Sequence, residues 1–379
     1  MKKNILLVEP AYNNPYPPLG LMKISTWHKR QGDDVLLIKD TFHNNLTLDI
    51  FEKNERCYKK FKDHYDIIYI TSLFTYQAQY VVNSIRYYQN RYPEAEIKVG
   101  GIMATLMPDY IKEKTGIEPH IGLLSEAENC PPDYSLDPKF PYSISFTTRG
   151  CPRKCPFCAV RKHEPKFVVR ENWPEDIDIT KKGIIFWDNN WLFSPNFEED
   201  IKRLIEFRKI GITQIDFNQG LDCRLFDKDK AKLLRQIKIK PLRFAFDNGA
   251  QDGHIQKAIK VAQKYGFKDI RVYVLYNFED GNDTPEYFYY RINELNKLRV
   301  LTYPMRYRPL NANGQFVSDN WDKKLLRALK LSLMFYYSKG MISKSREAFK
   351  DIYGNNSEEF KEKLYNIYEK DKMRKKKNE

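Results

Sequence analysis

Three cysteines lie within eight residues in the middle of the chain, as Cys151, Cys155 and Cys158. They follow a strand-like run at 142–149 and have the spacing C-x3-C-x2-C. Three thiolates can each bind one iron of a four-iron cluster and leave the fourth iron without a protein ligand. An iron with an open position is reactive, so this segment indicates chemistry and not only a structural staple.

Two other interpretations explain fewer of these residues. A structural zinc site normally has four protein ligands, and the nearest candidate for a fourth is His163, since no second Cys-x2-Cys pair is present. A thioredoxin-like redox pair would need only Cys155 and Cys158, and it would leave Cys151 without a role.

The length of 379 residues, 42% of them hydrophobic, is sufficient for two domains that each bury a core. There is no secretory leader and no long apolar stretch, so we expect a soluble cytoplasmic protein without membrane contact. The remaining cysteines, Cys57, Cys130 and Cys223, are scattered and do not indicate a disulfide framework. Cys223 is interpreted as a buried core residue.

The net charge of +14 is confined to one part of the chain. Residues 1–130 contain 16 basic and 16 acidic residues, whereas residues 131–379 contain 48 basic and 34 acidic ones. A basic surface attracts nucleic acid, phosphorylated metabolites or an acidic protein. A solvated, lysine-rich surface without a partner explains the same numbers.

Residues 1–125 alternate apolar runs with helical patterns, which is typical of a doubly wound parallel sheet. Strands are expected at 4–8, 35–38, 67–71 and 96–100, with a weak strand near His120. Helices are expected at 19–31 and 76–90. Prolines at 131, 132, 138 and 141 then predict an extended linker at 126–141.

Residues 142–310 show a second repeated pattern, which is typical of successive βα units. Six units are too few for a complete eight-stranded barrel, so we expect a partial (β/α)6 barrel. Residues 311–379 are expected to form a helical extension that ends in a basic tail. The apolar runs that predict the six strands lie around Ile144, Ile185, Ile215, Phe244, Val272 and Tyr303.

The cysteine spacing, after the first strand of a repeated βα domain, resembles the radical S-adenosylmethionine superfamily. The resemblance implies a [4Fe-4S] cluster held by Cys151, Cys155 and Cys158, whose open iron binds S-adenosylmethionine. One electron from the reduced cluster would cleave the sulfonium to methionine and a 5′-deoxyadenosyl radical. It also implies a reductant such as flavodoxin or ferredoxin. Phe157 resembles the family's aromatic residue that packs near the adenine.

Polar residues follow the next strands of this region, at the carboxyl ends where βα sheets bind ligands. Asp188 stands where the family often has a Gly-Gly-Glu-like segment, although the glycines are missing here. Taken singly, each of these residues is explained as well by a turn, a cap or an ordinary ion pair. The resemblance implies cofactor binding by Asp188 and Asn189, Asp222 and Arg224, Asp247 and Asn248, and Asn277.

The N-terminal region resembles the cobalamin-binding-type domain that precedes many radical S-adenosylmethionine cores. The resemblance rests on the segments 17–25, 71–73 and 99–101, and with the core it extends over residues 3–310. Domains that ligate cobalt carry Asp-x-His-x-x-Gly in their first βα loop, but the loop at 10–16 holds no histidine. Cobalamin bound without a histidine ligand is one expectation. A Rossmann-type domain that serves as a lid or substrate platform is the other.

These observations leave three functions open. The first is a radical S-adenosylmethionine enzyme on an unknown substrate, with methyl transfer as the natural reaction if cobalamin binds. The second is a radical enzyme that modifies nucleic acid (tRNA or DNA), which the charge of residues 131–379 favours. The third is a non-catalytic iron–sulfur protein with a binding or regulatory role. The substrate, small molecule or nucleic acid, stays undecided.

Overall fold

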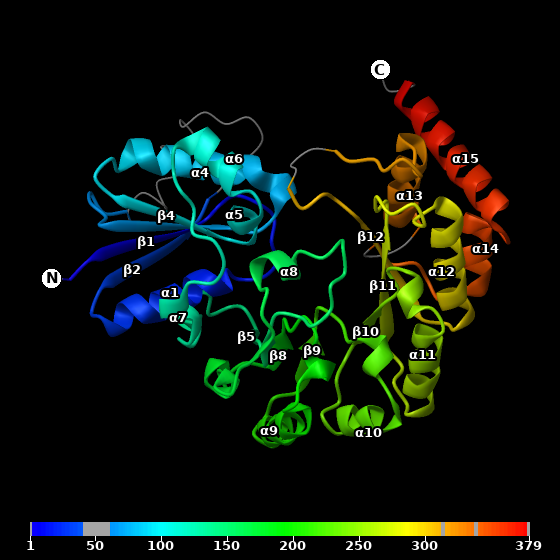
Figure 1. Ribbon diagram of the computed structural model, residues 1–379, viewed down its shortest axis with the longest axis horizontal. Coiled ribbons are helices and arrows are strands. Elements are labelled where there is room, and N and C mark those ends of the chain that lie inside the picture. Colours follow the sequence, from blue (N-terminus) through cyan, green and yellow to red (C-terminus); the bar gives the residue numbers. More distant parts are fainter. Residues whose placement is uncertain (1, 41–60, 312–314, 337–339, 377–379) are drawn as a thin grey trace. The chain divides into compact units, whose positions relative to one another are not determined.

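The computed structural model describes residues 2–40, 61–311, 315–336 and 340–376. The chain divides into two compact units (Figure 1), of which the first spans 1–182 with 309–314 and the second 183–308 with 315–379. The cysteine loop at 151–158 therefore belongs to the first unit. The domain boundaries expected at 125, 141 and 310 stay predictions, and Cys57 lies outside the described residues.

The first unit is built on a parallel sheet with the strand order β2-β1-β3-β4. The register places Ile5 of β1 beside Val35 of β2 and Ile67 of β3. All four strands are predicted by their apolar runs, and each is one or two residues longer than expected. Their bounds are Asn4–Glu9 for β1, Asp34–Lys39 for β2, Ile67–Ser72 for β3 and Glu96–Gly101 for β4.

Helices cover both faces of this sheet, because successive strand residues point to opposite faces. Leu6 and Val8 pack in one buried cluster with α4 (Ala78–Arg91), whereas Ile5 and Leu7 pack in another with α1 (Leu19–Arg30). Figure 1 shows α1 and α7 on one side of the sheet and α4, α5 and α6 on the other. The doubly wound arrangement is therefore confirmed.

The shorter helices of the first unit follow β4. The weak strand expected near His120 does not form, and a single hydrogen bond of 2.7 Å joins the His120 amide to the Val99 carbonyl instead. The segment passes the end of β4 too briefly to build a ladder. The helices are α5 (Ile102–Leu106), α6 (Pro108–Thr115), α7 (Ser125–Glu128) and α8 (Val160–His163).

All six strands expected in the βα series are present. The first, β5 (Tyr142–Ser145), lies in the first unit, and the other five lie in the second. Within the second unit β8 pairs with β9, and β11 pairs with both β10 and β12, all in parallel. These five strands are β8 (Gly183–Phe186), β9 (Gln214–Phe217), β10 (Leu242–Ala245), β11 (Ile270–Tyr276) and β12 (Leu301–Arg306).

Two backbone hydrogen bonds join the two strand groups of the second unit. The Leu221 amide donates to the Arg243 carbonyl at 2.8 Å, and the Lys240 amide donates to the Ile215 carbonyl at 3.0 Å. The carboxyl ends of β8 to β12 therefore form a continuous edge. The connecting helices are α9 (Phe197–Lys209), α10 (Lys228–Gln236), α11 (His254–Lys264) and α12 (Pro285–Lys297).

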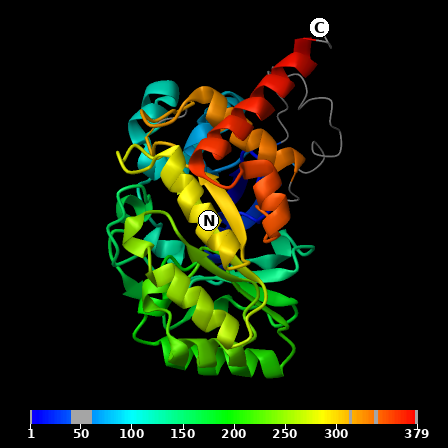
Figure 2. The ribbon, with the colours of Figure 1, turned by 90° about the vertical axis from the view of Figure 1, so that its right-hand side faces the viewer.

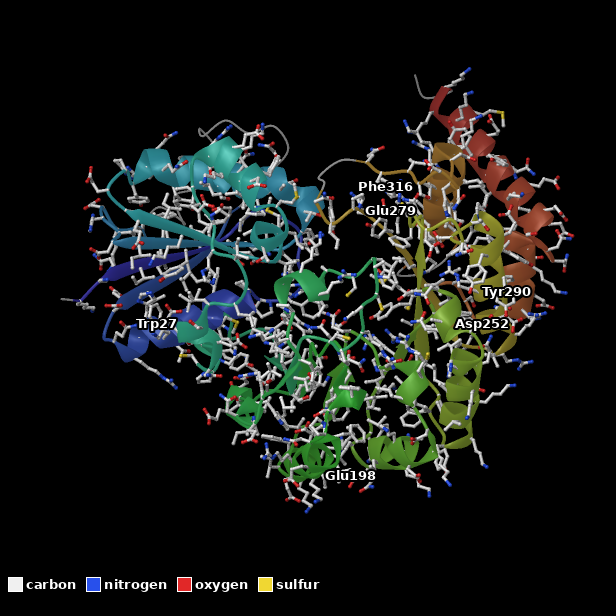
Figure 3. All side chains as sticks on the ribbon, viewed as in Figure 1. Trp27, Glu198, Asp252, Glu279, Tyr290 and Phe316 are labelled. Carbon is white, nitrogen blue, oxygen red and sulfur yellow. The ribbon has the colours of Figure 1, made fainter. Side chains whose placement is uncertain are left out.

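The C-terminal helices pack on the second unit through aromatic side chains. The ring of Phe360 lies 6.2 Å from that of Phe288 and 5.3 Å from that of Tyr289, both on α12. Figure 2 shows these helices beside α12, and Figure 3 shows Tyr290 of α12 near Asp252, to which its hydroxyl donates at 3.0 Å. The helices are α13 (Lys323–Phe335), α14 (Arg346–Tyr353) and α15 (Ser357–Lys376). Across the described segments, no helix combines the length and the apolar character needed to cross a membrane.

A buried carboxyl lies directly after β2. Asp40 is 2% exposed and accepts hydrogen bonds from the hydroxyls of Ser84 and, at 2.9 Å, Tyr88, both on α4. Burial raises the pKa of Asp40 to about 7, although the two hydrogen bonds act in the opposite direction. The folded protein therefore holds this proton more tightly than the unfolded chain does.

Replacement of this residue, Asp40→Asn, should change how stability depends on pH. The folded-state pKa is raised, so the wild type loses stability as pH rises from about 4 to about 7, by up to 1.4 kcal/mol per pH unit. The variant has no proton to lose at this position. The free energy of unfolding of the variant minus that of the wild type should therefore increase as the pH rises across that window. Urea unfolding at several pH values measures the difference, with the exposed Asp63→Asn as control. A difference that does not vary with pH would contradict the burial argument.

Candidate functional site

A short antiparallel pair of strands forms the base of the cysteine loop. Thr148 and Arg149 of β6 pair with Val169 and Val168 of β7 (Val168–Val169). The Arg170 amide extends the pairing by donating to the Thr147 carbonyl at 2.8 Å. Residues 150–167 therefore form a loop whose two ends are held together by this pairing, and the cysteines lie on the loop.

Gly150 makes the turn between β6 and the first cysteine. Its φ of +72° lies in the left-handed region, and a Cβ atom there would lie 2.1 Å from the Lys166 carbonyl oxygen. Its amide donates to Oε2 of Glu164 at 2.7 Å. The two ends of the loop are therefore in direct contact, and a side chain larger than that of glycine does not fit at position 150.

The three thiols fit an iron–sulfur cluster by their chemistry. Cys151, Cys155 and Cys158 are half-buried and form no disulfide. The Arg153 amide donates to Sγ of Cys151 at 3.4 Å, which is the kind of contact that tunes a cluster sulfur ligand. The Cys158 amide donates to the Cys155 carbonyl at 3.1 Å and closes a tight turn. Phe157, expected near the adenine, lies half-buried in this turn.

A zinc site built with His163 has less support. Nδ1 of His163 lies 3.0 Å from the Ala159 carbonyl oxygen, and Nε2 lies 3.6 Å from Oε1 of Glu164. Within the part of the chain that the structure describes, no group of three or more His, Cys, Asp or Glu side chains is placed to hold one metal ion. In a four-iron cluster each cysteine binds a different iron, so three cluster thiolates need not meet at one point.

Charged side chains surround the base of the loop. Arg149 pairs with Glu164 at 3.1 Å and, through Nε and Nη2, with both oxygens of Glu128 at 2.8 and 3.0 Å. Burial would raise the pKa of Glu164, but hydrogen bonding from His163, the Arg149 charge and the Gly150 amide lower it to about 2. Glu164 is therefore ionised at neutral pH.

In the second unit, four of the expected residues lie after the ends of β8 and β9. Asp188 is 2% exposed, and Asn189 follows it. The carboxylate of Asp222 accepts hydrogen bonds from Nε and Nη2 of Arg224 at 2.7 and 3.1 Å. It also accepts a hydrogen bond from Nδ2 of Asn190 at 3.3 Å. Asn190 is a member of this group that the sequence analysis did not select.

Asp247 belongs to the same edge. Its carboxylate accepts the Leu275 amide at 3.0 Å. Burial raises its pKa to about 6, while the Leu275 amide and the charges of Arg291 and Arg224 act in the opposite direction. The segment after β9 lies beside β10, since the Leu221 amide donates to the Arg243 carbonyl.

A buried arginine that the sequence did not reveal as a site residue bonds the backbone at this edge. Arg291 on α12 donates to the carbonyls of Phe246 at 3.0 Å and Asp247 at 2.7 Å, and it pairs with Asp283 at 2.7 Å. In the sequence it is a single charge directly before Ile292, between the apolar runs around Val272 and Tyr303. Its partners are distant in sequence, so they could not be assigned.

The other expected residues have structural contacts of their own. Asn248 caps the turn at 249–251 by accepting the Ala250 amide at 2.9 Å. Asn277 is fully buried, and its amide group bonds the backbone of Tyr307, Phe316 and Ser318. Their cofactor roles stay predictions. Cys223 is 4% exposed, and burial raises its pKa to about 12, in agreement with its interpretation as a core residue.

The turn at Gly150 gives a testable consequence. Gly150→Ala places a methyl group against the Lys166 carbonyl at a left-handed φ, so it should lower the free energy of unfolding by about 1–3 kcal/mol. Gly122→Ala is the matched control, because Gly122 has a φ of +82° with nothing within 4 Å. It should show the cost of the backbone conformation alone. Chemical unfolding of both variants measures the difference, and equal losses would show that the close approach at Gly150 does not matter.

Neither a family model nor a curated protein matches the sequence. Solved structures do match. The radical S-adenosylmethionine methyltransferase TsrM from Kitasatospora setae, with cobalamin and a [4Fe-4S] cluster bound, aligns with a TM-score of 0.61 and 13% identity over 82% of this chain and 76% of that chain. TsrM with tryptophan substrate and the analogue aza-SAM bound aligns with a TM-score of 0.64 and 12% identity over 81% and 73%. The chain therefore has the fold of a radical S-adenosylmethionine enzyme with an N-terminal Rossmann-like domain.

Proposed function

We propose that the chain is a radical S-adenosylmethionine enzyme. The observation that carries the proposal is the loop with Cys151, Cys155 and Cys158, whose half-buried thiols follow the first strand of a βα series. The likeness of fold to a radical S-adenosylmethionine methyltransferase supports it. The cysteine spacing and the fold are independent arguments, since identity with TsrM is only 13%.

The residues of the cysteine loop would divide the work of holding the cofactors. A bound four-iron cluster would supply the electron that cleaves S-adenosylmethionine to methionine and a 5′-deoxyadenosyl radical. The three thiolates would hold that cluster, and the Arg153 amide would offset charge on the Cys151 sulfur. Phe157 would lie along the adenine. A flavodoxin or ferredoxin is the proposed reductant.

The strand ends of the second unit are proposed to bind S-adenosylmethionine. Carboxylates of Asp188 and Asp247 would accept N–H and O–H groups of the amino acid and ribose parts. With its pKa near 6, Asp247 is mostly ionised at neutral pH and can accept such bonds. Asp222 holds Arg224 in one orientation by a two-point contact, and the guanidinium of Arg224 is proposed to bind the carboxylate of the cofactor.

Methyl transfer with cobalamin is the reaction that we propose to test first. Glu9 ends β1 at the carboxyl edge of the N-terminal sheet and is 3% exposed, and its Oε1 has no hydrogen-bond partner among the residues that the structure describes. An unpaired buried acceptor suits a ligand rich in amide N–H groups, as cobalamin is. In addition, α8, which follows the cysteines, lies against α5, which follows the Gly100–Gly101 turn of the same edge.

Modification of nucleic acid stays a second proposal, and it rests on charge alone. The excess of basic residues lies in 131–379, and the last turn of α15 adds Arg374, Lys375 and Lys376. A solvated lysine-rich surface explains the same charge, so this proposal stands second.

Anaerobic reconstitution tests the main proposal. Wild-type protein with iron, sulfide, dithionite and S-adenosylmethionine should release 5′-deoxyadenosine, and Cys155→Ala should reduce the release to background because one iron loses its ligand. Cys130→Ala, which removes a buried thiol outside the loop, should retain the activity. Chromatography of the products measures the result. A wild-type protein that holds an intact cluster and releases no 5′-deoxyadenosine would favour a non-catalytic iron–sulfur protein.

Cobalamin binding has a separate test that needs no cluster. Hydroxocobalamin should co-elute with the wild-type protein, and Glu9→Gln should weaken binding about tenfold because a charged acceptor becomes neutral. Glu96→Gln, at the opposite end of the sheet and exposed, should bind as the wild type does. Equilibrium dialysis gives the dissociation constants. No binding by the wild type would remove methyl transfer and leave hydrogen abstraction as the proposed chemistry.

A further inference from the structure

Four charged side chains form a connected series from the N-terminal sheet to the cysteine loop. Nζ of Lys23, on α1, donates to the backbone carbonyl of Glu128, on α7, at 2.5 Å. The carboxylate of Glu128 binds one edge of the Arg149 guanidinium, and Glu164 binds Nη1 of the same group at 3.1 Å. Glu164 then accepts the Gly150 amide at 2.7 Å. All of these residues belong to the first unit.

The series is buried, which makes its geometry specific. The side chains of Arg149 and Glu164 are 11% and 5% exposed, and that of Glu128 is 19% exposed. Burial lowers the pKa of Lys23 to about 8 although nearby acids oppose the shift. Removal of one member leaves its partner charged and out of water, so the members hold one another in place.

The guanidinium of Arg149 has one fixed plane. Its carbon lies 3.5 Å above the centre of the Phe146 ring, one edge meets Glu128 by two hydrogen bonds, and Nη1 meets Glu164. A lysine could supply the charge but not this fork. Arg149 and Gly150 precede Cys151 directly, and Glu164 follows α8. Glu164, at the end of the segment that carries the three cysteines, therefore contacts Arg149 and Gly150 at its start.

We propose that Arg149 and Glu164 are positioning residues for the iron–sulfur cluster and that Glu128 joins them to the N-terminal sheet. This inference rests on the proposed function, because it requires Cys151, Cys155 and Cys158 to hold a cluster. The pair fixes where the loop begins and ends, and its charges act on the potential of the cluster. Reduction adds one negative charge, so the carboxylate of Glu164 opposes it and the guanidinium of Arg149 favours it.

The reduction potential distinguishes this role from a structural one. In the reconstituted protein, Glu164→Gln should raise the midpoint potential of the cluster and Arg149→Met should lower it, because the two changes remove opposite charges. Both should alter the electron paramagnetic resonance spectrum of the reduced cluster. Glu164→Ala should also lose the cluster to a chelator about tenfold faster than the wild type. Glu175→Gln is the matched control, since this exposed carboxyl lies in the same unit outside the series.

Each outcome decides the inference. Opposite shifts in the two variants, with none in the control, support it. Unchanged potentials and unchanged cluster loss would overturn it, and so would shifts in the same direction, which indicate general disturbance of the loop. Should Glu164→Gln fail to fold, Glu128→Gln on the far side of Arg149 takes its place, and the same upward shift is expected. A wild-type protein that takes up no cluster would overturn the proposed function itself. A wild-type protein that takes up a cluster, with variants that show unchanged potentials, would overturn this inference alone.

Discussion

A hydrogen bond between the buried carboxylate of Glu164 and the amide of Gly150 joins the two ends of the cysteine loop. It acts together with the two-residue ladder between β6 and β7, the bond from the Arg170 amide to the Thr147 carbonyl, and the ion pair of Arg149 with Glu164. Arg149 and neighbouring donors lower the pKa of this carboxyl, so it is ionised at neutral pH and accepts the bond as a carboxylate. The three thiols occupy defined places because their loop has a closed base, and not because the loop itself has regular structure.

The second unit uses the same principle in a different form. Parallel strands bring polar residues to one edge, and Arg291 fixes the backbone there by bonding the carbonyls of Phe246 and Asp247. At the same edge, the carboxylate of Asp222 accepts a hydrogen bond from the guanidinium of Arg224 and fixes its orientation. A binding edge of this kind is pre-organised: the charged groups reach it already oriented, and a ligand need not order them.

The sequence was sufficient for those features that depend on local pattern. Apolar runs predicted all four strands of the N-terminal sheet and all six of the βα series, because buried parallel strands are nearly continuous apolar segments. It was not sufficient for contacts between distant residues. Arg291 and Glu164 read as ordinary charges on helices or loops, and only the folded chain brings Gly150 to Glu164. The cofactor residues at strand ends were placed by resemblance, and two of them, Asn248 and Asn277, hold the local backbone in the structure.

The packing of Phe360 against Phe288 and Tyr289 means that the C-terminal helices complete the second unit. The chain leaves that unit near Pro309 and returns to it near Gln315, so the unit is discontinuous in sequence. A fragment cut at the end of the last βα strand would carry an uncovered aromatic surface on α12. A fragment that contains α12 should therefore retain the first turns of α15, which carry Phe360, because an uncovered aromatic surface favours aggregation.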